Sequence, residues 1–145
     1  MKRLFILVSL STSLVASAQK NFQPGYIITN DGQRIEGLIN YREWNHNPRQ
    51  IDFTTNKNAN DEQNFTVKDI RYFEITGKES YERFPARISM DERSNVSLAL
   101  ERDTSYKTDT VFMKLHARGQ HLNLYSYTDG LKTRFYILRA DDSEI

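Results

Sequence analysis

The segment Asn30–Gln33, with the sequence Asn-Asp-Gly-Gln, constrains the fold of this chain more than any other feature. It separates two apolar runs, Gly25–Thr29 and Arg34–Tyr41, and a two-residue Asp-Gly loop in that position is typical of a β-hairpin. Gly37 falls where the alternation of the second run slips, which predicts a bulge or a sharp bend. The chain therefore begins its fold with antiparallel strands.

Strand signals continue along the chain. Ile51–Thr55 and Arg71–Ile75 are short apolar runs, and the turns at Gly119-Gln120 and Asp129-Gly130 divide residues 110–139 into a three-stranded meander. Pro85 lies inside the alternating run Glu79–Met90, and proline predicts an edge strand or a bulge there. No segment after residue 18 shows sustained helical periodicity, so the expected fold class is all-β.

Three connecting segments complete this expectation. Thr66 and Asp69 have the spacing in which a hydroxyl caps a turn and the acid bonds back to its amide, which predicts one turn before Arg71. Residues 54–63 are almost entirely polar and predict a solvated excursion. Residues 91–109 fit either a loop or a helical turn near Ser97–Arg102. The strand order resembles an SH3-like small barrel over about residues 24–76, joined to antiparallel strands and the C-terminal meander.

The N-terminus predicts export. Lys2 and Arg3 precede an apolar stretch, and Ala16-Ser17-Ala18 has the small-x-small form that signal peptidase accepts. We expect residues 1–18 to be a signal peptide cleaved between Ala18 and Gln19, because the apolar stretch is shorter than the roughly 20 residues of a spanning helix. Residues 19–145 would then form a single β-rich periplasmic domain, either free or the N-terminal part of a longer protein.

Composition narrows the possible classes of protein. Removing Lys2 and Arg3 from the 20 basic residues leaves 18, against 19 acidic residues, so the exported domain carries a net charge of −1. Near-neutrality argues against electrostatic binding of nucleic acid or an anionic membrane. The chain has no cysteine, which excludes disulfides, thiolate metal sites and lipid attachment at the cleavage point.

A set of short motifs runs along almost the whole exported domain. They are GYIITNDG at residues 25–32, GLI at 37–39, Trp44 with Asn47-Pro48, VKDIRYF at 67–73, SYERF at 80–84, DERS at 91–94 and LYSYTDG at 124–130. These motifs are structural in kind, and together they resemble those of a family of exported Bacteroidetes-type proteins of unknown function.

The resemblance implies attachment to the outer membrane, because longer members carry this β-rich region ahead of an outer-membrane β-barrel. Members are also often labelled tRNA-modification GTPases. A phosphate-binding loop of that class ends in Gly-Lys-Ser/Thr, whereas Gly77-Lys78 is followed by Glu79 and Tyr72 stands where the earlier glycine belongs. We therefore expect this protein to bind no GTP, no nucleic acid and no cofactor.

The sequence also gives little indication of a catalytic or metal-binding site. His116 and His121 flank a turn and are able to face each other, but two histidines are short of a metal site and are expected to face solvent. There is no Gly-x-Ser-x-Gly elbow, and nothing distinguishes a catalytic carboxylate pair from solvated acids. We expect a protein that is not an enzyme.

Trp44 leaves two interpretations open. In a polar loop with Asn45 and Asn47 it suits stacking on a sugar or anchoring a partner, and Tyr125 and Tyr127 share a strand face that offers a second binding surface. The structural alternative, which we favour, is that the indole folds back as a lid over the barrel, and that the tyrosine face is the half-exposed side of an amphipathic strand.

The leading expectation is a non-catalytic cell-envelope module that contacts an envelope protein or a continuous outer-membrane barrel. The alternative is a carbohydrate- or small-ligand-binding module built around Trp44.

Overall fold

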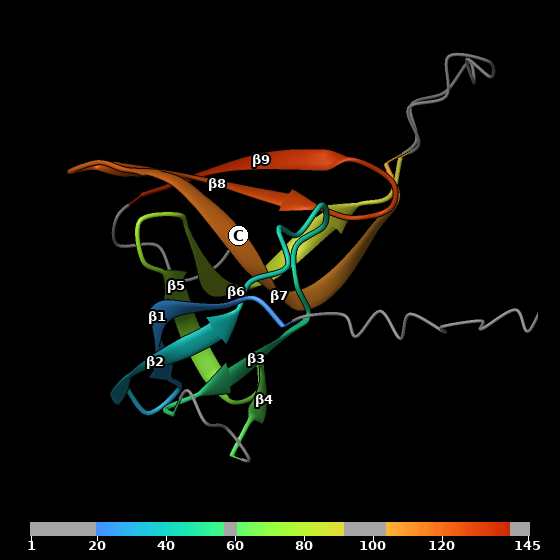
Figure 1. Cartoon of the computed structure of the whole chain (residues 1–145). Coiled ribbons are helices and arrows are strands. Elements are labelled where there is room, and N and C mark those ends of the chain that lie inside the picture. Colours follow the sequence, from blue (N-terminus) through green and yellow to red (C-terminus); the bar gives the residue numbers. More distant parts are fainter. Residues whose placement is uncertain (1–19, 57–60, 92–103, 140–145) are drawn as a thin grey trace, which may run out of the picture.

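The protein folds as one continuous antiparallel sheet. A computed structural model describes residues 20–56, 61–91 and 104–139, and within these ranges it contains strands and no helix. The sheet order is β4-β3-β2-β1-β5-β6-β7-β8-β9, which confirms the all-β prediction (Figure 1). The strands are β1 (Phe22–Thr29), β2 (Arg34–Asn40), β3 (Gln50–Thr54), β4 (Gln63–Thr66), β5 (Ile70–Ile75), β6 (Glu79–Ser89), β7 (Tyr106–Arg118), β8 (Leu122–Thr128) and β9 (Thr133–Arg139).

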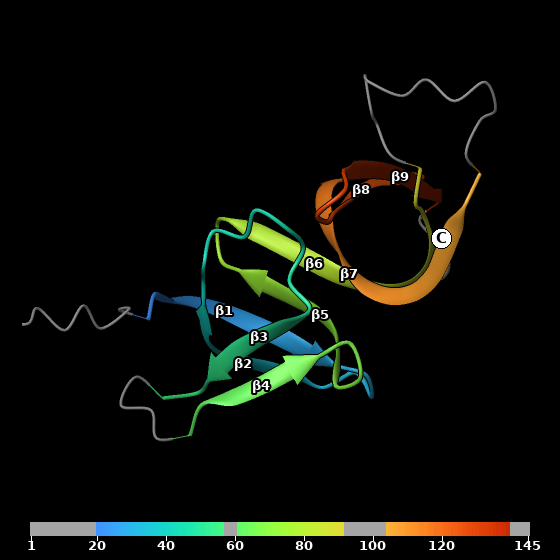
Figure 2. The same ribbon diagram turned by 90° about the vertical axis from the view of Figure 1, so that its right-hand side faces the viewer.

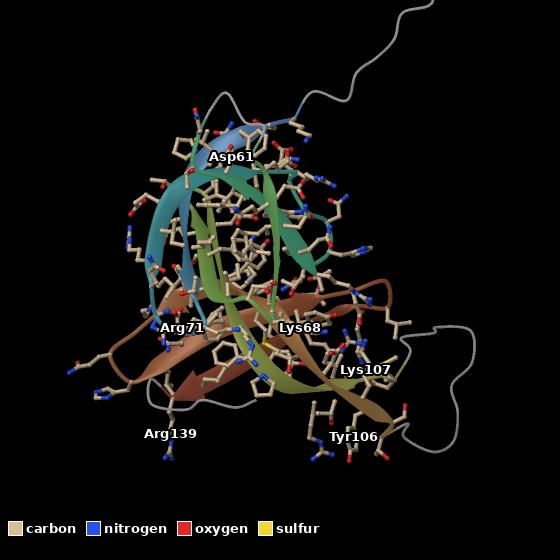
Figure 3. The ribbon with its side chains drawn as sticks, turned by 90° about the horizontal axis from the view of Figure 1, so that it is seen from below. Asp61, Lys68, Arg71, Tyr106, Lys107 and Arg139 are labelled. Carbon is tan, nitrogen blue, oxygen red and sulfur yellow. The ribbon has the colours of Figure 1, made fainter. Side chains whose placement is uncertain are left out.

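Strands β1 to β5 form an N-terminal half that curls around its own core. Its strand order is compatible with the expected SH3-like barrel. Figure 3 shows the interior filled with side chains, with Asp61 at one end and Lys68 and Arg71 at the end facing the remaining strands. The buried core residues are Ile27, Ile39, Tyr41, Ile51, Phe53, Ile70, Phe73, Ile75, Tyr81 and Phe112.

Two glycines allow this half to curl tightly. Gly25 and Gly37 pair across β1 and β2, and the register continues through them without a shift, so of the two predicted alternatives at Gly37, a bulge and a sharp bend, the bulge is wrong. A Cβ atom on Gly37 would lie 2.4 Å from Cζ of Phe53, and one on Gly25 would lie 2.2 Å from the Glu74 carbonyl oxygen. A glycine is needed at position 37 because β3 packs closely against it, and not because the strand contains an extra residue.

The first hairpin is confirmed, although its loop is longer by one residue than predicted. The Thr29 amide donates to the Gln33 carbonyl at 2.9 Å, which leaves Asn30, Asp31 and Gly32 as a three-residue loop. Gly32 has a φ of +96°, as the left-handed position of such a loop requires. The Thr66–Asp69 turn is also confirmed, because the Asp69 carboxylate accepts from the Thr66 amide at 2.8 Å. Strand β4, just before it, had not been expected.

Strands β6 to β9 form a C-terminal half, a meander that curls into a ring when viewed along its axis (Figure 2). The predicted three-stranded meander is confirmed as β7 to β9. A second core fills its concave side: Phe84, Ala86, Ile88, Val111, Met113, Tyr125, Tyr127 and Leu138. Strands β6 and β7 belong to both halves, since Tyr81 and Phe112 pack in the first core and Phe84 and Val111 in the second.

A buried arginine joins the two ends of this curl. Arg134 in β9 is 8% exposed, and its Nε donates to the Ser89 carbonyl at the end of β6 at 2.8 Å. Its Nη1 donates to Oδ1 of Asp129 at 3.0 Å. The guanidinium therefore satisfies a carbonyl and a carboxylate where β6 and β9 approach each other without pairing as strands.

Pro85 in β6 predicted an edge strand or a bulge. In the sheet order β6 is an interior strand, and its pairing with β7 runs through Pro85 without a bulge. Its pairing with β5 ends at Glu82, however, so among the described strands only β7 pairs with β6 at Pro85. The proline is tolerated because this stretch of β6 is locally an edge.

Some predicted segments lie outside the described residues. These are the signal peptide at residues 1–18, part of the polar excursion at residues 57–60, and the undecided segment at residues 92–103.

Candidate functional site

The loop between β2 and β3 crosses from the N-terminal half to strand β8 (Figure 1). Asn47 fastens it there. Its Nδ2 donates to the carbonyls of Phe112 at 2.8 Å and Ser126 at 3.1 Å, and its Oδ1 accepts from the Thr128 amide at 2.9 Å. Its own amide donates to the Thr128 carbonyl at 2.9 Å. The Asn47 amide group is thus engaged in joining β7 to β8, and it is not a free binding group.

Trp44, in the same loop, packs on the first core. The half-buried indole makes edge contacts with three aromatic rings, at centroid distances of 5.5 Å to Tyr41, 5.7 Å to Tyr81 and 6.0 Å to Phe73. This is the arrangement that the lid interpretation requires. Asn45 is exposed and lies in the loop between Trp44 and Asn47. We call the hydrogen bonds of Asn47 to Phe112, Ser126 and Thr128 the Asn47 clasp.

The two tyrosines of β8 correct the expected orientation of that strand. Tyr125 and Tyr127 are 1% and 5% exposed and face the concave core, whereas Leu122 on the opposite face is 54% exposed. The interpretation of the tyrosine side as half-exposed is therefore wrong. The Tyr125 hydroxyl donates to Glu82 at 2.7 Å, which gives its buried polar end a partner. Burial raises the pKa of this hydroxyl, so it stays neutral.

A cavity of about 180 Å³ lies beside the Asn47 clasp, and we call it the junction pocket. It exists because β8 pairs with β7 only from Lys114 onward, which leaves the edge of β7 before Lys114 without a neighbour from β8. Segments of four separate elements surround the gap. The lining residues are Asn47, Pro48, Arg49, Val67, Asp109, Thr110, Val111, Phe112 and Tyr127.

Three polar side chains of the junction pocket lack an ion-pair partner or a side-chain hydrogen-bond partner within the described ranges. Arg49 and Asp109 form no ion pair there, and both residues are exposed at the pocket. The hydroxyl of Tyr127 makes no hydrogen bond to another described residue, although the side chain is buried. Burial raises its pKa, and the charges of Arg49 and Asp109 also act on it in opposite directions. The pocket therefore combines apolar walls with both signs of charge.

Of the residues proposed from sequence, only Asn47 and Tyr127 meet in the junction pocket. Trp44 covers the first core, Asn45 lies outside the lining, and Tyr125 points into the second core. Sequence reasoning missed Arg49, Asp109 and Phe112. No local pattern marks them, because the pocket depends on where β8 leaves β7.

The convex face of β8 and β9 carries a second feature, which we call the β9 strip: Leu122, Leu124, Phe135 and Ile137. Register places Leu124 opposite Ile137 on this face, and Phe135 and Ile137 are 65% and 72% exposed. Strand β9 is also the last strand of the sheet order, so its outer edge has no neighbouring strand in the described part of the chain. An apolar strip beside an open edge is a feature of interaction surfaces.

The arrangement of the described residues gives little support for metal binding or phosphate binding. His116 contacts the Ser126 hydroxyl at 2.7 Å and His121 is exposed. In the three described ranges, no group of three or more His, Cys, Asp or Glu side chains is arranged to hold a metal ion. Gly77-Lys78 lies in the tight turn between β5 and β6, where Gly77 has a φ of +71°. A strand follows this turn, whereas a helix follows the phosphate-binding loop of a GTPase. None of the described residues forms a helix long and apolar enough to cross a membrane.

Comparisons of the chain with protein-family models, with curated proteins and with solved structures found no match. The functional argument therefore rests on the geometry of the junction pocket and of the β9 strip.

Proposed function

We propose that this protein is a non-catalytic, exported cell-envelope module that binds an extended strand of another envelope protein along β9. The observation that carries the proposal is a strand edge that no other strand of the described ranges pairs with, together with Phe135 and Ile137, which remain 65% and 72% exposed. Large apolar side chains exposed beside a strand edge are a common mark of a surface where another strand binds.

The shape of β9 suits the addition of a strand. A partner strand would hydrogen-bond to the open edge, and apolar side chains at alternate positions would cover Phe135 and Ile137 on the convex face. The other end of the sheet is a poorer candidate, because β4 has four residues and begins with the exposed polar pair Gln63 and Asn64. The seven residues of β9 offer the longer and more apolar edge.

The proposed compartment comes from the sequence. A signal peptide at residues 1–18, cleaved between Ala18 and Gln19, would deliver the domain to the periplasm or the outer membrane. The partner would then be an envelope protein or an outer-membrane barrel continuous with this chain. The alternative of a sugar-binding site centred on Trp44 is less favoured, since the indole edges and the Asn47 amide are already occupied.

Site-specific photocrosslinking in a bacterium with two membranes tests the proposal. A photoreactive residue at Ile137 should yield one dominant adduct with an envelope protein, and the same residue at Gln63 on the β4 edge should not. Phe135→Lys should abolish the Ile137 adduct, because a charge on an edge strand opposes pairing, while Gln63→Lys should leave it unchanged. The processed chain should begin with Gln19.

Two results would contradict this function. Equal adducts from Ile137 and Gln63, or adducts unaffected by Phe135→Lys in a variant that folds, would show that β9 is no docking edge. An unprocessed chain in the cytosol with Met1 at its N-terminus would overturn the compartment.

A further inference from the structure

We propose that the junction pocket binds a small zwitterion: a molecule the size of a free amino acid that carries a carboxylate, an ammonium group and an apolar side chain. This inference is independent of strand docking at β9, because the two sites share no residue.

The size and walls of the cavity set the scale of the ligand. A volume of about 180 Å³ corresponds to roughly six water molecules, which suits a single amino acid and is too small for a drug-sized molecule. Pro48, Val67, Val111 and Phe112 form apolar walls. Water in such a space has few partners, so an aliphatic side chain replaces it favourably.

The charges select the polar end of the ligand. The Arg49 guanidinium is a planar donor that suits a carboxylate, and in the described ranges it has no carboxylate partner. Oδ1 of Asp109 accepts from the Thr110 amide at 2.9 Å, which leaves its other oxygen for an ammonium group. Arg49 and Asp109 do not approach each other within the 4.0 Å of an ion pair. A ligand with one charge would engage one of them, whereas a zwitterion engages both.

Tyr127 adds a neutral donor to the lining that holds these two charges. Its side chain is 5% exposed, and its hydroxyl makes no hydrogen bond to another described residue. Because burial raises its pKa, the hydroxyl keeps its proton and is able to donate a hydrogen bond to a carboxylate oxygen. Thr110 contributes a second hydroxyl-bearing side chain to the lining.

The pocket is also held in place before any ligand arrives. The Asn47 clasp fixes the chain immediately before Pro48 and Arg49, through hydrogen bonds to Phe112, Ser126 and Thr128. A preformed site spends little binding energy on ordering its loops. This matters for a ligand with few atoms to contribute.

Calorimetric titration of the purified full chain provides the test, with L-leucine and L-alanine as probes. L-Leucine should bind at least tenfold more tightly than N-acetyl-L-leucine, which lacks the ammonium group, and than L-leucinamide, which lacks the carboxylate. Arg49→Gln should weaken leucine binding at least tenfold and leave leucinamide unchanged. Asp109→Asn should weaken leucine and leave N-acetyl-leucine unchanged.

Arg71→Gln, an exposed arginine outside the lining, is the matched control and should bind leucine normally. Thermal unfolding of each variant confirms that it is folded. Absence of binding by both amino acids at about 10 mM, where even weak specific affinities are measurable, would overturn the proposal. So would leucine binding that either analogue matches, or that survives Arg49→Gln.

Discussion

Asn47→Ala should destabilise this protein far more than the same substitution at Asn45, two residues earlier. The Asn47 side chain makes three hydrogen bonds, at 2.8 Å to the Phe112 carbonyl, 3.1 Å to the Ser126 carbonyl and 2.9 Å from the Thr128 amide. Each is worth about 1 kcal/mol net, and more where the abandoned partner stays out of water, so we expect a loss of about 2–4 kcal/mol. Exposed Asn45 makes no side-chain hydrogen bond in the described ranges, and Asn45→Ala should stay within about 0.5 kcal/mol.

A third variant separates the donor from the acceptor. Asn47→Asp keeps an oxygen for the Thr128 amide but brings a carboxylate against the carbonyl oxygens of Phe112 and Ser126. This variant should be less stable than Asn47→Ala at neutral pH, because two acceptors then face a negative charge.

Urea unfolding, followed by the fluorescence of the single tryptophan and by circular dichroism, measures all three changes. A loss of about 3 kcal/mol corresponds to a melting temperature lower by roughly 10 °C. If Asn47→Ala were as stable as Asn45→Ala, the clasp would contribute nothing. The claim that it holds the two halves together would then be refuted.

Three further predictions concern other parts of the fold. Trp44→Ala should cost about 3 kcal/mol, and in the native protein the indole should emit at short wavelength and resist iodide quenching; a freely quenched indole with a stable alanine variant would refute the lid. Arg134→Ala should cost about 3–5 kcal/mol in urea unfolding, because it leaves the Asp129 carboxylate and the Ser89 carbonyl without their buried partner, whereas exposed Arg34→Ala should have little effect. Burial opposes ionisation of Asp129, but hydrogen bonds from Arg134 and two backbone amides outweigh it and lower the pKa of Asp129 below 3.8. Its stabilisation should therefore be present at neutral pH and be lost as the pH falls below about 4, and Asp129→Asn should flatten the acid limb of a stability-against-pH curve.

Local patterns predicted the elements whose cause is local. The hairpin at Asp31-Gly32 and the Thr66–Asp69 turn depend on residues a few positions apart, and both are present. The meander followed from alternation and turn residues. The bulge predicted at Gly37 as one of two alternatives is absent, because the same residue type serves a bulge and a close contact, and only the position of Phe53 distinguishes them.

The orientation of β8 had no local cause. Leu122 and Leu124 alternate with Tyr125 and Tyr127, and an apolar set on each face is consistent with either side being buried. The direction of the curl decides which face is buried: both tyrosine rings lie on the concave side, where the Tyr125 hydroxyl reaches Glu82, and the leucines stay on the convex side. The curl itself depends on contacts such as Arg134 to Ser89, 45 residues apart in sequence.

The junction pocket and the Asn47 clasp have the same physical origin. Strand β7 runs on through both halves, but β8 pairs with it only from Arg118 back to Lys114 and then separates from it. Where the two strands separate, their backbone groups lose the partners that a ladder would supply, and buried groups of this kind must be satisfied in another way. Asn47 does so for Phe112, Ser126 and Thr128 at the narrow end of the gap. One side chain does not fill the gap, and the space that remains beside Asn47, lined in part by Arg49, Asp109 and Tyr127, is the site proposed to hold a ligand.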